Sequence, residues 1–113
     1  MIEVEIPVHI ASSLNLREQW RIRPNRNSSH RAAAWFALKG AKVKPVVPCV
    51  VTLTRIAPRQ LDDANLQGGF ESVRTGIADW FGLDDADPRV SWRYEQAKGK
   101  PKQYAARVRI EAK

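Results

Sequence analysis

The stretch LDDANLQGGFESVRTGIADWFGLDDAD, residues 61–87, decides the fold, because its apolar residues follow a helical period. They recur at intervals of four, three, four and four, at Leu66, Phe70, Val73, Ile77 and Phe81. This spacing is typical of a helix with one buried face. The pattern predicts a helix over 65–81 that ends at Gly82, with a pair of aspartates on each side.

The segments around this helix predict strands. Residues 2–10, IEVEIPVHI, alternate between apolar and polar side chains, and Pro7 favours a sheet edge. Residues 46–56, VVPCVVTLTRI, form a nearly continuous β-branched run, as expected of an interior strand covered on both faces. Residues 89–96 and 103–110 predict a terminal hairpin, one face of which carries Arg93, Arg107 and Arg109.

Residues 17–31, REQWRIRPNRNSSHR, predict an arginine-rich loop before a second helix. Pro24, two asparagines and two serines favour the loop, and the helix is expected to start at Ser28 or Ser29 and to stop at Gly40. With 113 residues, 43% of them apolar, we expect one α+β domain over residues 1–113. Its core would be a mixed sheet of about four strands with two helices.

Charge is distributed unevenly along the chain. Lys and Arg outnumber Asp and Glu by 10 to 3 in residues 1–61 and by 8 to 2 in 88–113, whereas residues 62–87 hold 1 basic and 7 acidic residues. A solvated helix face would normally mix the two signs. A basic body around an acidic island suits a polyanion, with the island holding divalent cations where a phosphate reacts.

Other protein classes are disfavoured. No apolar run approaches the ~20 residues of a membrane span, and the alternating N-terminus lacks the order of a signal peptide. The one cysteine, Cys49, lies in an apolar setting that predicts a buried structural thiol in a reducing compartment. We expect a cytoplasmic protein with no membrane partner and no small-molecule cofactor.

The basic residues are candidates for binding nucleic acid. Arginines beside Trp20 suit phosphates and an unpaired base, and lysines extend the tip of the expected hairpin. The alternative is a hydrated loop with Trp20 folded onto the core and an ordinary exposed hairpin, but the clustering favours DNA. The candidates are Arg21, Arg23, Arg26, Arg31, Arg59, Arg93, Lys98, Lys100 and Lys102.

The acidic pairs have two interpretations. Asp62 or Asp63 can cap the following helix, and the Asp-rich stretch before Pro88 suits a turn. However, Asp84, Asp85 and Asp87 come just after the helix end, where negative charge is mildly unfavourable. A hard cation held by carboxylate oxygens would compensate for that placement.

Residues 59–96, RQLDDANLQGGFESVRTGIADWFGLDDADPRVSWRYEQ, resemble the heart of the RusA-type family of Holliday-junction resolvases. The family pattern is an Arg-rich lead, an acidic D-x-D-N-L motif, an amphipathic helix, and a downstream D-D followed by a strand. The resemblance implies a small homodimeric endodeoxyribonuclease of mixed α/β fold that nicks four-way DNA junctions with Mg²⁺ (or Mn²⁺). By position it implies catalytic carboxylates at Asp62, Asp63 and Asp85, with Asp84 as a further metal ligand.

The chain departs from the family pattern at two places. The second motif aspartate falls on Ala64, and the basic residue after the motif falls on Gly68, Gly69 or Ser72. Either Asp63 replaces the missing ligand by a shift of one residue, or this chain binds junctions without cutting them well. Losing one carboxylate from so small a set would be serious for metal binding.

The acidic pairs are also far apart along the helix. A straight helix over 65–81 is roughly 25 Å long, so the pairs could not share a metal within one chain. Either the helix breaks at Gly68-Gly69, or two chains of a two-fold dimer form composite sites. In that dimer, antiparallel helices would bring Asp62 and Asp63 of one chain to Asp85 of the other.

The leading interpretation is therefore a RusA-like junction endonuclease. The alternative is a catalytically degenerate dimeric module that binds DNA or RNA, of phage or prophage origin. A third, an RNA-binding or phage assembly protein on the same fold, is also compatible, because fold alone does not determine function.

Overall fold

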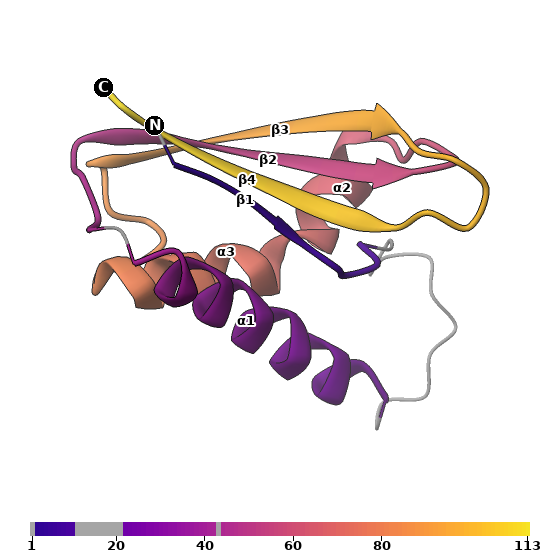
Figure 1. The fold of residues 1–113 in the computed structure, drawn as a ribbon, viewed down its shortest axis with the longest axis horizontal. Coiled ribbons are helices and arrows are strands. Elements are labelled where there is room, and N and C mark those ends of the chain that lie inside the picture. The colour runs from indigo at the N-terminus through magenta and orange to yellow at the C-terminus, as the bar shows by residue number, and fades with distance from the viewer. Residues whose placement is uncertain (1, 11–21, 43) are drawn as a thin grey trace.

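The computed structural model describes residues 2–10, 22–42 and 44–113, and the side chains of residues 22–28 lie outside that description. These residues form four strands of one sheet and three helices (Figure 1). In chain order the elements are β1 (Ile2–Ile6), α1 (Ile22–Gly40), β2 (Cys49–Ala57), α2 (Asp63–Gly69), α3 (Glu71–Phe81), β3 (Val90–Lys98) and β4 (Ala105–Ala112). The α+β class and the mixed four-stranded sheet are thus as predicted.

The sheet has the strand order β1-β4-β2-β3, and this order contradicts the expected terminal hairpin. Strands β3 and β4 do not pair with each other; β2 lies between them, parallel to β3 and antiparallel to β4. The physical reason lies in β2, whose residues are mostly buried. An apolar strand gains most from the centre of a sheet, where both of its edges find hydrogen-bond partners.

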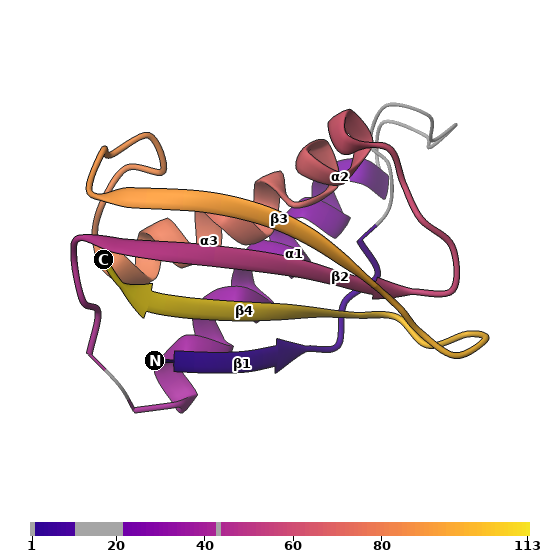
Figure 2. The ribbon, with the colours of Figure 1, turned by 90° about the horizontal axis from the view of Figure 1, so that it is seen from above.

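All three described helices lie on one face of the sheet, and none of them lies over the opposite face, here called the open face (Figures 1 and 2). Strand β2 is interior, as predicted, but helices cover only one of its two faces. The core fills the space between sheet and helices with residues that are almost fully buried: Leu38, Val51, Leu53, Phe70, Val73, Ile77 and Val108. The predicted helical stripe therefore packs against the sheet.

The predicted helix over 65–81 is divided into α2 and α3. The break lies at Phe70, directly after Gly68 and Gly69, which have low helix propensity. Gly82 ends α3 with φ of 72°, a left-handed conformation that glycine adopts without strain, as the helix-stop prediction required. The chain thus has three helices in its described part, where two were expected.

Two boundaries differ from the prediction at the start of the chain. Helix α1 ends at Gly40 as expected but begins at Ile22, so residues assigned to a loop are helical. Pro24 is compatible with this, because N–H groups in a first helical turn have no intrahelical acceptor to lose. Strand β1 does lie at a sheet edge, but it ends at Ile6, just before Pro7, and not at residue 10.

Two further expectations concern the single cysteine and membrane-spanning helices. Cys49 is fully buried, and this burial raises the pKa of its thiol, as expected of a structural cysteine. Across residues 2–10, 22–42 and 44–113, no helix has the length and apolar character needed to cross a membrane.

Candidate functional site

Asp62, the first motif aspartate, is the N-cap of α2. One carboxylate oxygen accepts a hydrogen bond of 2.8 Å from the Asn65 backbone N–H, and the other accepts one of 2.8 Å from the Asn65 side-chain amide. Asn65 is buried, so these two hydrogen bonds, both donated by Asn65, fix the start of α2 against the core. The capping interpretation of Asp62 is therefore confirmed, and both of its oxygens are engaged.

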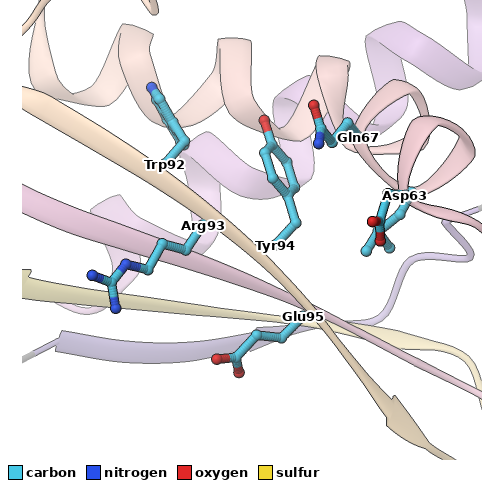
Figure 3. Close-up of a pocket in the computed structure, with 7 residues that line it drawn as sticks. Asp63, Gln67, Trp92, Arg93, Tyr94 and Glu95 are labelled. Atoms are coloured by element: carbon cyan, nitrogen blue, oxygen red, sulfur yellow. The ribbon is translucent and has the colours of Figure 1, made fainter.

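Asp63, in contrast, is exposed on the first turn of α2. It lines a surface hollow of about 360 Å³ together with Leu66, Gln67 and residues 92–95 of β3. In Figure 3, Trp92 and Tyr94 point from β3 toward the helices, whereas Arg93 and Glu95 point away toward the open face. Leu66, Gln67, Trp92 and Tyr94 therefore share the helix side of the hollow with Asp63, whereas the second carboxylate of its lining, Glu95, points the other way.

The second acidic segment forms a turn, in agreement with the simpler of its two interpretations. One oxygen of Asp84 accepts a hydrogen bond from the Ala86 N–H, and one of Asp87 accepts from the Arg89 N–H. Asp87 also pairs with the Arg89 guanidinium at 2.8 Å, and these contacts lower the pKa of its carboxyl to about 2. Aspartates that bond backbone two residues ahead are ordinary turn chemistry.

Arg74 of α3 holds the turn against the sheet. Its guanidinium donates hydrogen bonds of 3.0 Å to the Asp85 carbonyl oxygen and to the Tyr94 hydroxyl, and it lies 4.8 Å from the Trp92 ring centroid. The Trp92 indole N–H donates to the same carbonyl at 2.9 Å. The Asp85 carboxylate itself is 3.6 Å from the Arg74 Nε. Sequence reasoning missed Arg74, although it is the single basic residue within residues 62–87.

The two acidic segments do not meet within one chain. Figure 1 places α2 and the turn after α3 toward opposite ends of the sheet, even though the helix breaks between them. In the part of the chain that the structure describes, no three His, Cys, Asp or Glu side chains are grouped to hold a metal ion. Both carboxylate oxygens of Asp62 accept hydrogen bonds from Asn65, and the Asp85 carboxylate faces a guanidinium. The carboxylates of one chain therefore do not form a set of ligands that fits Mg²⁺.

Several basic candidates gather at one end of the molecule, which we call the basic end. It comprises the first turns of α1, the loop of residues 58–62 and the connection of residues 99–104 (Figures 1 and 2). Arg59 and Lys98, Lys100 and Lys102 are exposed there. Arg23 and Arg26 belong to the first turns of α1, but their side chains, like all of Arg21, lie outside the described residues. Asp62 and Asp63 begin α2 at this same end.

Of the two remaining arginine candidates, Arg31 and Arg93, Arg31 alone pairs with an acidic side chain among the described residues. Arg31 pairs with Asp79 at 2.7 Å, on the surface between α1 and α3. Arg93, Arg107 and Arg109 share the open face as predicted. Glu3 of β1, however, lies 3.7 Å from Arg107 and 3.2 Å from Arg109. Among the described residues Arg93 alone of these three makes no ion pair, so the open face is a mixed surface rather than a uniformly basic one.

Comparison of the sequence with protein families and with curated proteins finds no match.

Proposed function

We propose that the chain is a DNA-binding protein of the RusA-like type that recognises four-way junctions. The observation that supports the proposal is the basic end, because the segments that carry the exposed residues Arg59, Lys98, Lys100 and Lys102 lie toward the same end of the sheet as the start of α2. Lysine and arginine at such a surface bind backbone phosphates and release their counterions. The motif residues Asp62 and Asn65 fix the helix that this surface adjoins.

Binding is tested with a labelled four-way junction and a linear duplex of the same sequence, in EDTA and over a range of salt concentrations. We expect tighter binding of the junction. Replacing Lys98, Lys100 and Lys102 by Gln should weaken it and reduce the salt slope by about 0.9 for each phosphate that is no longer neutralised. The control is a variant in which Lys42, Lys44 and Lys113 are replaced by Gln, because it loses the same number of positive charges at other positions. An RNA duplex of the same sequence is measured alongside. Equally weakened binding in both variants, or tighter binding of the RNA than of the junction, would contradict the proposal.

Metal-dependent nicking of the junction is the second candidate function. The exposed carboxylate of Asp63 favours it. Within the described residues the Asp63 carboxylate makes no hydrogen bond or ion pair, and Asp63 begins α2 at the basic end. Within one chain, Asp62 and Asp63 lie too far from Asp85 for the three carboxylates to share a metal ion. A two-fold dimer with antiparallel α2–α3 segments would bring Asp62 and Asp63 of one copy to Asp85 of the other. The nicking candidate therefore requires the dimer.

Nicking is tested on the same two substrates with and without Mg²⁺ or Mn²⁺, with wild type, Asp85→Asn and Ala64→Asp. Asparagine at 85 keeps the backbone carbonyl that Arg74 and Trp92 bind, so this variant should fold. Junction-selective, metal-dependent nicking that Asp85→Asn abolishes would support the enzyme. Junction binding without nicking, and gain of nicking in Ala64→Asp, would instead identify a degenerate binding module.

A further inference from the structure

Helix α1 carries an aromatic surface outside the core, formed by Ala32, Trp35 and Phe36. The Phe36 side chain is 65% exposed, and its ring lies edge to face with that of Trp35, 5.0 Å between centroids. With Arg31 and Asp79 these residues line a surface hollow of about 320 Å³ between α1 and α3. Two adjacent aromatic rings on one outer helix face form a larger apolar patch than a single exposed side chain would.

The aromatic surface is held on a rigid support. On its opposite face α1 buries Ala34 and Leu38 completely. Helix α3 approaches α1 closely at Gly76, where an added Cβ would lie 2.3 Å from the Arg31 carbonyl oxygen. Because α1 is fixed by this contact, the outward direction of the rings is set by the packing of two helices.

Cations accompany the aromatic residues along the helix. Arg31, Trp35 and Lys39 are spaced by four residues and therefore follow one ridge of α1, about 12 Å long at 1.5 Å per residue. The Lys39 ammonium lies 4.5 Å from the Trp35 ring centroid. The chain contains no Asp or Glu from residue 19 to residue 61, so α1 adds no negative charge. Among the residues that line the hollow, the single acid is Asp79 of α3, which pairs with Arg31.

We propose that this aromatic surface stacks an unpaired nucleobase of DNA, while Lys39, which has no acidic partner among the described residues, meets a neighbouring phosphate. Exposed aromatic rings interleaved with cations are the arrangement by which proteins bind single strands without base specificity. The surface would engage bases that lose their stacking when a four-way junction opens at its crossover. The inference deepens the proposed function and rests on its DNA-binding part, not on nicking.

The test is fluorescence polarisation in EDTA with a labelled 12-nucleotide oligothymidylate, the junction and the blunt duplex. Phe36→Ala should weaken binding of the single strand about fivefold or more, the effect of losing one stacked base, and leave duplex binding unchanged. Phe36→Tyr keeps the ring and should restore wild-type affinity. Val46→Ala removes apolar surface at another exposed site and is the matched control. Lys39→Gln should weaken binding and lower its salt dependence.

The outcomes separate this inference from the proposed function. If wild type does not prefer the junction over duplex, the proposed function fails whatever Phe36 does. If wild type prefers the junction but Phe36→Ala binds the single strand as tightly as Val46→Ala, the stacking inference alone is overturned. It is also overturned if Phe36→Ala changes the oligomeric state in light scattering but not the affinity for single strands, because the surface would then be a protein interface.

Discussion

The Arg74 guanidinium donates a hydrogen bond of 3.0 Å to the Asp85 carbonyl oxygen, and so connects α3 to the acidic turn that precedes β3. The same side chain bonds the Tyr94 hydroxyl and lies over the Trp92 ring. A single arginine thus holds a helix, a turn and an edge strand together. The conformation around Asp85 depends on this contact.

Replacing Arg74 by Gln should destabilise the protein by about 1–3 kcal/mol, because the Tyr94 hydroxyl and the partly buried Asp85 carbonyl lose a charged donor. Arg74→Lys should recover only part of this, since an ammonium lacks the planar fork that reaches both acceptors. The measurement is urea unfolding followed by circular dichroism. Arg93→Gln, on the open face and without an ion pair in the described residues, should change stability by less than about 0.5 kcal/mol. Similar destabilisation by Arg74→Gln and Arg93→Gln would refute the role of Arg74.

Asp62 should contribute to stability as a helix cap whether or not it binds metal. Asp62→Ala removes both acceptors of Asn65 and should cost about 1 kcal/mol, whereas Asp62→Ser keeps a capping oxygen and should retain most of the stability. Unfolding of the two variants in urea gives the comparison. If serine were as destabilising as alanine, the contribution of Asp62 would not be capping.

The same pair of variants bears on nicking. A hydroxyl at position 62 can cap the helix but is a poor substitute for a carboxylate ligand. If the dimer nicks junctions, Asp62→Ser should therefore remain folded and lose metal-dependent activity. Full activity in Asp62→Ser would exclude Asp62 from any metal site.

The sequence allowed the local elements to be predicted better than their pairing. The helical period through Phe70 and Ile77 depends on neighbours three and four residues apart, so it is visible in the sequence. Alternation likewise identified β3 and β4, but it could not reveal that β2 lies between them. Strand partners are decided by competition among distant segments, and here the most buried strand took the centre of the sheet.

In the candidate site, too, local contacts could be predicted from the sequence and contacts between elements could not. Capping by Asp62 was foreseeable, because an aspartate just before a helix period is a local signal. The contact of Arg74 with the Asp85 carbonyl was not, because it joins a side chain to a backbone atom across a turn. The single basic residue in an acidic segment was a clue to its role, but the direction of its side chain depends on how α3 packs.

Gly76 should be the glycine least tolerant of alanine in the α1–α3 contact. An added Cβ would lie 2.3 Å from the Arg31 carbonyl oxygen, so the helices must move apart, at a cost of about 1–3 kcal/mol or more. Gly40→Ala is the control, because it has no atom within 4 Å of its added Cβ and should be neutral or slightly stabilising. Thermal unfolding distinguishes the two, and equal melting temperatures would contradict the close approach of α3 to α1.

Stability should fall in acid through Asp87, whose folded pKa of about 2 lies below its ordinary value of 3.8 because Arg89 bonds and pairs with the carboxylate. A carboxyl with a depressed folded pKa contributes stability above its unfolded pKa and loses it as pH falls through the folded value. The contribution should therefore be complete above pH about 4 and disappear toward pH 2. Asp87→Asn keeps an oxygen for the Arg89 N–H but loses the charge. In thermal unfolding it should be less stable than wild type at pH 6 and equal to it near pH 2; a difference that does not change with pH would show that the Arg89 ion pair is not its source.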